Sequence, residues 1–340
     1  MSPVTNGQVI FNEAPAPGPL VPGKSGMIYK EDSIDIDTVA LDGGFLVKVL
    51  YLSIDPVILG RLGGPPGWGY VAGKPILNYG LGRVLRSEHA SFKAGDLVYG
   101  LMNFEEYTVY PVAQAGQFSV VDNSIPLVAW LGPVGLAGES AYYGWKEHVP
   151  STVKGKVCFV SSGAGGVGSM VIQLAKRDGM KVIASAGSEE KVAIMKQLGA
   201  DVAFNYKTTA TKDILAKEGP IDVYWDNVGG ETLEAAIDAA APFAHFIECG
   251  MVSGYDGQAY GIKNLFLTIP KSIQIHGFVV VYLASKWGAE FRETIPKLIA
   301  SGEIKYNIEV VKGLEKAEEV FIGQLSGKVT GKPVIQVGAE

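Results

Sequence analysis

The stretch from Lys156 to Lys191 reads KVCFVSSGAGGVGSMVIQLAKRDGMKVIASAGSEEK, and its pattern decides the fold. Its first apolar run, Val157–Val160, predicts a buried parallel strand. The glycine-rich turn Gly163–Gly168 follows, matches G-x-G-x-x-G and leads into a helical pattern. A second apolar run, Lys181–Ser185, completes a βαβ unit. Because the glycines lie between a strand and a helix, the stretch predicts a dinucleotide-binding Rossmann unit.

These glycines have two explanations. In the functional one, they allow a tight turn, close approach of the backbone to a pyrophosphate, and close packing of helix on strand. The start of the helix then offers free N–H groups and the positive end of its dipole to the phosphates. In the structural one, the glycines serve only the packing of the turn. The βαβ context favours nucleotide binding.

The end of the second strand indicates which nucleotide binds. NAD sites usually carry an acidic residue there, on the adenosine ribose, but this strand ends in the sequence Ser185-Ala-Gly-Ser188. Glu189 and Glu190 suit the first turn of the next helix, with Ser188 as its N-cap. Lys191 follows one turn in and can reach a 2′-phosphate, so we expect NADPH rather than NADH. The alternative is that Lys191 is an ordinary solvated lysine.

Length and composition restrict the function classes. A chain of 340 residues is long enough for two domains, and 47% hydrophobic with 19% charged residues is ordinary for a globular enzyme. The net charge of −6 gives no basic footprint for nucleic acid or for an acidic membrane. No apolar stretch is long enough to span a bilayer, and the start MSPVTNGQ lacks the features of a secretory signal.

Metal-ligating residues are few. Cys158 and Cys249 are the two cysteines, too few for a disulfide framework or a cysteine-based zinc lobe, and we expect both to be small buried residues of strands. No ligand spacing joins the histidines, which are His89, His148, His245 and His276. The sequence therefore predicts no metal site, and it is consistent with a reducing cytoplasmic location.

The pattern of the chain changes near residue 131. Residues 1–130 show short β-like runs separated by turns, which predicts a β-rich, partly open barrel of the GroES-like kind. Residues 131–302 alternate strands with helices and predict a doubly wound parallel Rossmann sheet. The tail, 303–340, is β-like again. We therefore expect an α/β protein with a substrate domain of residues 1–130 and 303–340 and an NADPH-binding domain of residues 131–302.

The Rossmann domain is expected to have six strands joined by right-handed crossovers. After the opening unit, strands are predicted at Val202–Tyr206, Ile221–Trp225, Ala244–Cys249 and Ile273–Val280, with helices at Glu189–Leu198, Ala210–Lys217 and Glu231–Ala240. The apolar run Gly277–Ala284 suits a buried strand. A helix from Ser285 to Ala300 is expected to leave the domain.

Several local motifs together resemble one family. They are Ser53-Ile-Asp-Pro56, Ala141-Tyr142, Gly163–Gly168, Gly187-Ser-Glu-Glu-Lys191, Phe204-Asn-Tyr-Lys207, Asp226-Asn-Val-Gly-Gly230 and Gly277-Phe-Val-Val280. Over nearly its whole length the chain resembles the zinc-independent medium-chain dehydrogenase/reductase superfamily, and within it the leukotriene/prostaglandin reductase and plant alkenal double-bond reductase family. The resemblance implies NADPH-dependent, metal-independent reduction of the C=C bond of α,β-unsaturated aldehydes and ketones, with the hydride added to the β-carbon.

The resemblance also implies where the cofactor binds. At the pyrophosphate it places Gly165, Gly166, Val167 and Gly168. At the 2′-phosphate it places Gly187, Lys191 and Tyr206. Along the nicotinamide half it places Asn227, the stretch from Cys249 through Ser253 to Tyr255, and a strand of Phe278, Val279 and Val280. For Tyr206 the alternative is an aromatic residue closing the edge of the core, and for Asn227 it is a turn-former.

Zinc-dependent relatives carry a Gly-His-Glu signature where this chain reads Leu77-Asn78-Tyr79. Without zinc, hydrogen bonds alone polarise a carbonyl, which favours hydride addition to an alkene already activated by conjugation. Tyr79 matches a family tyrosine near the substrate and is our candidate for stabilising the enolate, the alternative being a core tyrosine. Tyr255 is a second substrate-site candidate, either as a wall of the nicotinamide site or as an ordinary loop aromatic.

Three positions depart from the family pattern. Val57 and Pro270 stand where relatives carry tyrosine, and Val329 stands where relatives carry a cofactor-contacting asparagine. These changes remove two pocket hydroxyls and favour proton donation by water or by the cofactor ribose.

Two other functions fit the same motifs. One is a quinone reductase or a pathway-specific ene reductase of the same superfamily. The other is a non-catalytic protein that binds NADPH. The expected partners are a small enal or enone substrate and a second copy of the chain, with no nucleic acid and no membrane. We expect this homodimer to form through an apolar edge strand at Ile273–Val281, because such an edge should not stay exposed.

Overall fold

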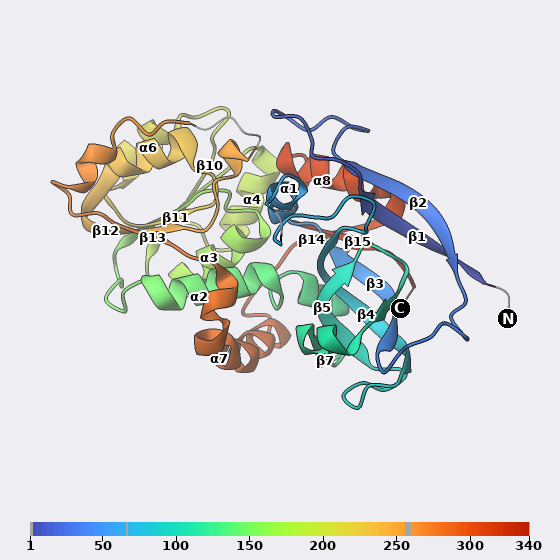
Figure 1. Ribbon diagram of the computed structural model, residues 1–340. Coiled ribbons are helices and arrows are strands. Elements are labelled where there is room, and N and C mark those ends of the chain that lie inside the picture. Colours follow the sequence, from blue (N-terminus) through green and yellow to red (C-terminus); the bar gives the residue numbers. More distant parts are fainter. Residues whose placement is uncertain (1–2, 66, 256–259, 340) are drawn as a thin grey trace. The chain divides into compact units, whose positions relative to one another are not determined.

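The computed structural model describes residues 3–65, 67–255 and 260–339. The chain divides into two compact units, one made of residues 1–132 and 308–340 and the other of residues 133–307 (Figure 1). Each unit has its own sheet and its own hydrophobic core. One sheet is mainly antiparallel and the other is parallel, which confirms the predicted fold class.

The first unit is built mainly from strands. Its seven-stranded sheet has the order β14-β15-β3-β4-β5-β7, with β6 paired to β3, while β1 and β2 form a separate ribbon. The strands are β1 (Val4–Phe11), β2 (Met27–Ile34), β3 (Phe45–Ser53), β4 (Leu77–Ser87), β5 (Leu97–Asn103), β6 (Tyr107–Tyr110), β7 (Phe118–Val121), β14 (Ile308–Lys312) and β15 (Lys332–Gln336). The helices are α1 (Val57–Leu62) and α8 (Ala317–Leu325).

Aromatic packing holds the core of this unit. The Phe45 ring is fully buried, with the ring centroids of Phe92 and Phe118 at 4.3 and 5.4 Å. Burying one such ring contributes about 1.5–3 kcal/mol. The end of the chain joins this sheet, because β15 pairs antiparallel with β3 in a register that places Val334 opposite Ser53.

The second unit is a parallel sheet with helices. Its strand order is β10-β9-β8-β11-β12-β13. The strands are β8 (Val157–Val160), β9 (Lys181–Ala186), β10 (Val202–Asn205), β11 (Ile221–Asp226), β12 (Ala240–Glu248) and β13 (Gln274–Gly277). The helices are α2 (Leu136–His148), α3 (Gly166–Arg177), α4 (Glu189–Gln197), α5 (Thr211–Glu218), α6 (Gly230–Ala239) and α7 (Val280–Ala300).

The strand order reverses between β8 and β11. The chain runs outward from β8 through β9 to β10, and then returns to β11 and continues outward to β13. Ligands of doubly wound sheets bind outside the carboxyl ends of the strands at this reversal. The core beneath is apolar: Phe159 on β8 stacks on Tyr224 of β11, with centroids 5.0 Å apart, and both are fully buried. A rigid parallel sheet therefore positions the loops at its carboxyl edge.

The predicted strand at Ile273–Val280, and the buried strand at Gly277–Ala284, are wrong beyond residue 277. β13 ends at Gly277 and α7 begins at Val280. The run is also exposed, with Val281 at 56% and Tyr282 at 80%. Its β-branched residues favour a strand locally, but propensity is a weak prior. The buried positions of α7, Gly288, Phe291, Ile295 and Ile299, recur at helical spacing and extend the helix back over the run.

Three further helices were not predicted: the short α1 of the first unit, α8 in the tail and α2 in the second unit. In the tail, α8 buries Ala317, Val320 and Phe321, which lie three and four residues apart on one face. In the second unit, α2 precedes the first parallel strand and packs against α3 and α7. Within the described residues, no helix has both the length and the apolarity that a membrane span requires.

Candidate active site

The glycine-rich turn lies between β8 and α3, at the reversal of strand order. Gly168 is needed by the fold, because a Cβ there would lie 2.4 Å from the Ser162 carbonyl oxygen and 2.8 Å from Gly163 Cα. Gly165 is much less constrained: it has φ −76°, and a Cβ would lie 3.3 Å from the Ser162 carbonyl oxygen, a tight contact that a shift of a few tenths of an ångström relieves. Packing thus explains Gly168 but not Gly165, which leaves close approach of a ligand as the use of the missing side chain at Gly165.

Gly165 is the N-cap of α3. No side chain of the described chain caps this end, and its first turn carries no acidic residue. The N–H groups of Gly166, Val167 and Gly168 occupy that first turn. An uncapped helix start with this polarity suits an anion.

The adenosine end of the proposed nucleotide site lies at the carboxyl ends of β9 and β10. The Ser188 hydroxyl accepts the Lys191 N–H at 3.3 Å, which confirms Ser188 as the N-cap of α4. Gly187 lies beneath two side chains, since its Cβ would be 3.0 Å from the Tyr206 hydroxyl and 3.2 Å from Lys207 Cε. Tyr206 itself follows β10 and is 51% exposed; it is not a core-edge aromatic.

Lys207 is a site candidate that the sequence reasoning missed. It stands directly after Tyr206 in the Phe204-Asn-Tyr-Lys207 motif, which was the available signal. The nearby carboxylate of Glu189 is held by the Asn205 amide at 3.0 Å. Lys207 therefore lies beside Gly187, and Lys191 stands in the first turn of α4, which begins just after it. Two positive charges near this strand end are what a 2′-phosphate would require.

Asn227, at the end of β11, uses its side chain within the protein. Its amide group donates to the Ser161 carbonyl at 2.7 Å, and its amide oxygen accepts from the Trp225 indole at 3.3 Å. Its backbone N–H donates to the Ser161 hydroxyl at 2.9 Å. This side chain joins the tips of β8 and β11, so a contact with a cofactor would come mainly from the backbone around it.

The stretch from Cys249 to Tyr255 follows β12 and is tied to the Asn227 loop. Ser253 donates through its hydroxyl to the Val228 carbonyl at 2.6 Å. The Tyr255 hydroxyl accepts the Met251 N–H at 3.4 Å, and the Tyr255 side chain is 40% exposed. Cys249 was expected to be a buried strand residue, but it follows the end of β12 and is only half-buried. Desolvation of its thiol raises the pKa to about 12, so the thiol stays protonated at neutral pH.

The residues after β13 divide into two groups. The Phe278 ring lies against Trp225 and His148, at centroid distances of 6.0 and 5.8 Å, and beside Gly144 of α2. Its side chain is therefore packed into the protein. Val279 is 52% exposed, and Val280 begins α7. These three residues form a turn into a helix rather than the expected strand.

Three of the four histidines meet in this unit, although they are far apart in sequence. His245 Nδ1 and His276 Nε2 are 3.2 Å apart, and the His148 ring stacks on His276 with centroids at 4.9 Å. Burial lowers the pKa of each, which favours neutral rings. The described residues contain no group of three or more ligating side chains arranged for a metal ion.

Tyr79 lies on β4 in the first unit. Its ring is partly buried and stacks on Tyr99, with centroids 5.5 Å apart and 20° between planes. Tyr99 in turn contacts Trp130 at 5.9 Å. The preceding residue, Asn78, points to the opposite face of the strand, because side chains alternate along a strand. The aromatic stack thus restricts the Tyr79 ring, and with it the position of the Tyr79 hydroxyl.

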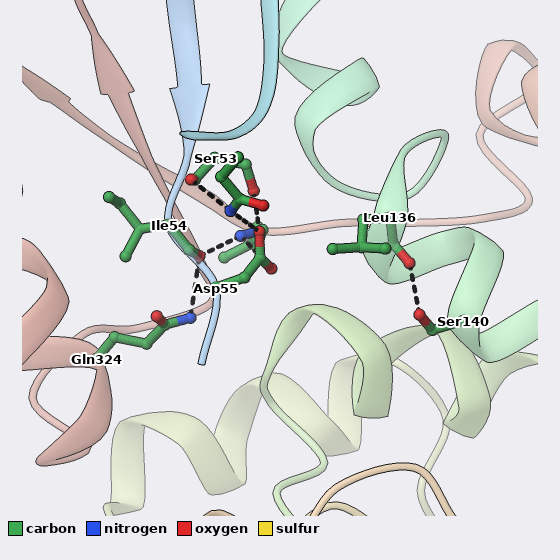
Figure 2. A network of polar contacts seen from close by, with 8 residues as sticks. Ser53, Ile54, Asp55, Leu136, Ser140 and Gln324 are labelled. Atoms are coloured by element: carbon green, nitrogen blue, oxygen red, sulfur yellow. Dashed lines mark hydrogen bonds and ion pairs between the residues drawn. The ribbon is translucent and has the colours of Figure 1, made fainter. Parts of the chain in front are cut away.

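Asn78 belongs to a buried polar network that includes an ion pair. Lys332 Nζ lies 2.8 Å from Asp55 Oδ1, and Asn78 donates to Asp55 Oδ2 at 2.8 Å. Figure 2 shows Ser53, Asp55 and Gln324 at the turn that carries Ile54; the Ser53 hydroxyl donates to Asp55, and Gln324 donates to the Ile54 carbonyl. Burial lowers the pKa of Lys332, and the Asp55 carboxylate opposes that shift.

The network fixes the turn between β3 and α1. Val57, one of the departures from the family pattern, is the first residue of α1 and is 39% exposed. Pro270 lies between a short 3-10 turn and β13 in the second unit, and Val329 lies in the loop between α8 and β15. None of the three carries a polar side chain.

Known proteins resemble this chain over both of its units. The family model described as zinc-binding dehydrogenase matches residues 166–300, and one described as the N-terminal domain of oxidoreductase matches residues 30–119. The chain is 38% identical to (+)-pulegone reductase of Mentha piperita, over 88% of this chain and 89% of that protein. It is 36% identical to the NADP(+)-dependent 2-alkenal reductase of Nicotiana tabacum, over 94% of each.

A solved structure is also similar. CurA of Vibrio vulnificus, crystallised in complex with NADPH, is 28% identical, with a TM-score of 0.88 over 98% of this chain and 100% of that one. Both units are therefore covered by the likeness. From the sequence relatives and this shared architecture, the chain belongs to the zinc-independent reductases of the medium-chain dehydrogenase/reductase superfamily.

Proposed function

We propose that this protein is an NADPH-dependent reductase of the C=C bond in α,β-unsaturated aldehydes and ketones. The observation that carries the proposal is the uncapped start of α3 at Gly165, a glycine that packing of the turn constrains far less than Gly168. The lysines around Gly187 add the charge that a 2′-phosphate needs. Relatives named as a pulegone reductase and an NADP-dependent alkenal reductase support the substrate class.

The residues present fit NADPH. Gly165, Gly166, Val167 and Gly168 would hold the pyrophosphate, and Gly187, Lys191, Tyr206 and Lys207 would surround the 2′-phosphate. The loops at Asn227 and at Cys249–Tyr255 would lie along the nicotinamide half, together with Val279 and Val280. When bound, NADPH supplies the hydride for the β-carbon of the alkene.

In the proposed reaction, negative charge moves to the substrate carbonyl oxygen and gives an enolate. Tyr79 would donate a hydrogen bond to that oxygen. The aromatic stack of Tyr79 on Tyr99 restricts the ring, so the donor is placed before the charge develops. Water or the cofactor ribose would then supply the proton to the α-carbon, since Val57 has no hydroxyl.

The function is tested by following NADPH oxidation with a panel of enals, enones and quinones, and by repeating the panel with NADH. We expect saturated carbonyl products and a preference for NADPH. Turnover of quinones alone would assign the protein to the quinone reductases instead. Allylic alcohol products would contradict conjugate reduction. NADPH binding with no turnover on any substrate would favour a non-catalytic role.

Replacing Tyr79 with phenylalanine tests the proposed donor. Losing one hydrogen bond to a developing oxyanion costs on the order of 100-fold in kcat, whereas NADPH affinity should not change. Steady-state kinetics with one good enone, together with an NADPH titration, measure both. Tyr107→Phe, on β6 of the same unit, is the matched control and should retain full activity. Unchanged kcat in Tyr79→Phe would leave Tyr79 as a core tyrosine.

We also propose a cytoplasmic homodimer. Two free cysteines fit a reducing compartment. At the edge of the parallel sheet, β13 pairs only with β12 among the described strands. Exposed apolar side chains precede and follow it in the chain, with Phe266 at 65% and Ile269 at 80% before it and Tyr282 at 80% after it, and we refer to these three as the patch. A second copy of the chain that covers this patch and pairs with β13 would satisfy the unpaired strand edge and remove the exposed apolar side chains from water.

Light scattering should therefore give about twice the chain mass of 36.1 kDa. Placing a charge in the patch with Ile269→Glu should raise the dimer dissociation constant by at least about tenfold, because the carboxylate would be buried unpaired. Val21→Glu, at a site that is 54% exposed in the first unit, is the control and should leave the mass unchanged. A monomeric wild-type protein would contradict the proposed dimer.

A further inference from the structure

Two carboxyl groups lie side by side at the carboxyl edge of the parallel sheet. Asp226 ends β11, Glu248 ends β12, and the two are direct register partners. Register partners on neighbouring strands point to the same face, so their side chains are neighbours. Both are removed from water: Asp226 is fully buried, and neither carboxyl oxygen of Glu248 is accessible. The sequence signal was a glutamate that ends an apolar strand, and the sequence reasoning gave it no role.

The two carboxyl oxygens of Asp226 differ in the number of hydrogen bonds that they accept. Oδ1 accepts four hydrogen bonds, from Ser161 Oγ at 3.1 Å, Tyr224 Oη at 2.7 Å, Val228 N at 2.7 Å and Gly229 N at 2.8 Å. Oδ2 and both oxygens of Glu248 have no donor among the described residues. Two ionised carboxylates cannot share such a site without strong repulsion. One proton held between one oxygen of Glu248 and Asp226 Oδ2 removes the repulsion and gives two of these three oxygens a partner.

The proton belongs on Glu248. Burial, and then the charge of Asp226, raise the pKa of Glu248 to about 8. Burial also raises the pKa of Asp226, but the donors on its Oδ1 oppose this and favour the ionised form. The other titratable groups that interact with the pair are Tyr224, Cys249 and Tyr255. Within the described chain, no charge on α6 or β13 shifts Glu248, and its register partner on β13 is Gly277.

The pair lies where two loops of the proposed nicotinamide site begin. The Asp226 carbonyl accepts the N–H groups of Cys249 at 3.0 Å and Gly250 at 3.1 Å. The Val228 carbonyl accepts the N–H of Ser253 at 3.0 Å. Both loops are thus anchored to the strand tips that carry the two carboxyl groups. A second negative charge between those tips would push the loops apart.

We propose that Glu248 is a positioning residue whose protonated carboxyl donates to Asp226 and holds loops 227–230 and 249–255 in the arrangement that binds the nicotinamide half of NADPH. Because NADPH must bind here, this role rests on the proposed function. When Glu248 loses its proton, the loops separate and the nicotinamide half is no longer held. The adenosine half, at β9 and β10, lies on other strands and keeps its geometry.

The test compares NADPH with 2′,5′-ADP, which lacks the nicotinamide half, in calorimetric titrations at about pH 7 and pH 9. Wild type should lose about tenfold in NADPH affinity over this range, because only about a tenth of the protein keeps the proton one unit above its pKa. Affinity for 2′,5′-ADP should change much less. Glu248→Gln should abolish the difference, since its amide donates to Asp226 at every pH. Glu105→Gln is the control: this buried carboxyl of the first unit accepts from Thr108 and Asn103 and should leave the wild-type pH dependence intact.

Thermal unfolding gives a second readout that needs no ligand. Between the ordinary pKa of 4.5 and about 8, folded Glu248 keeps a proton that the unfolded chain has lost. Stability therefore falls as pH rises across this window. Glu248→Gln should remove this contribution, so its Tm should exceed that of wild type by an amount that grows from pH 5 to pH 8.

Three results would overturn the role of Glu248. They are an alkaline loss of NADPH affinity that persists in Glu248→Gln, an equal loss for 2′,5′-ADP, and failure of Glu248→Gln to fold at neutral pH, where its amide copies the protonated carboxyl. Absence of NADPH binding by wild type at pH 7 would instead overturn the proposed function.

Discussion

Replacing Lys332 with methionine is expected to lower the free energy of unfolding by about 3–5 kcal/mol, because it leaves the Asp55 carboxylate buried without its ion-pair partner. The Lys332 side chain is 3% exposed and that of Asp55 is 11% exposed, so water cannot replace the lost partner. The change also removes a hydrogen bond to the Ile54 carbonyl. Chemical denaturation with a probe in the first unit measures the loss.

Two variants make this prediction specific. Lys328→Met changes an exposed lysine just before the same strand and should alter stability by less than about 0.5 kcal/mol. Asp55→Leu combined with Lys332→Met removes both charges, and should recover part of the loss, as buried ion pairs replaced by apolar residues often do. A stability loss in Lys332→Met no larger than in Lys328→Met would show that Asp55 is solvated after all.

The same network should influence turnover. Asn78, which donates to Asp55, directly precedes Tyr79 on β4. In Lys332→Met, under conditions where the protein stays folded, we expect kcat to fall more than NADPH affinity, because the binding residues of the cofactor lie in the other unit. Equal losses in both would indicate general unfolding rather than displacement of Tyr79.

Replacing Gly165 with alanine is expected to weaken NADPH binding by about 10- to 100-fold while leaving the fold intact. The Cβ needs only a small local shift, since its nearest neighbour is the Ser162 carbonyl oxygen at 3.3 Å and φ is −76°. It would, however, stand where the pyrophosphate would approach the backbone, and losing one charge-assisted hydrogen bond costs about 1.5–3 kcal/mol. Titration with NADPH and thermal unfolding separate the two effects.

Gly168→Ala provides the contrast. Its Cβ would lie 2.4 Å from the Ser162 carbonyl oxygen, a backbone atom that cannot move away cheaply. We expect it to lower stability as well as affinity, by about 1–3 kcal/mol or more. Gly116→Ala, in the first unit with nothing within 4 Å, is the neutral control. Full NADPH affinity in Gly165→Ala would mean that the turn is kept for packing alone.

Local patterns were predictable because their causes lie within a few residues. The order strand, glycine turn, helix and strand in Lys156–Lys191 was identified from short-range rules of burial, turn geometry and periodicity, and the structure confirms it. The N-cap at Ser188 was found for the same reason, since a hydroxyl and an N–H three residues away suffice to form it. Once the strands were predicted, the positions of Gly165 and Gly187 after the ends of those strands followed from the strand boundaries.

Contacts across the chain were not predictable in this way. The start of α7 at Val280 depends on packing of Phe291 and later residues, and this overrides the local preference of its valines for a strand. The ion pair of Asp55 and Lys332 joins residues 277 apart. No local pattern distinguishes such a lysine from a solvated one.

By itself, the sequence determined the α/β class, the nucleotide-binding βαβ unit, its cap and its glycines, and the resemblance to reductases, because short-range hydrogen bonding and steric limits are written in neighbouring residues. Only the tertiary structure decided which glycine the fold requires, where α7 begins, and that Asp226 and Glu248 share one buried site. Those outcomes depend on burial, and the burial of a side chain is set by elements distant in the sequence.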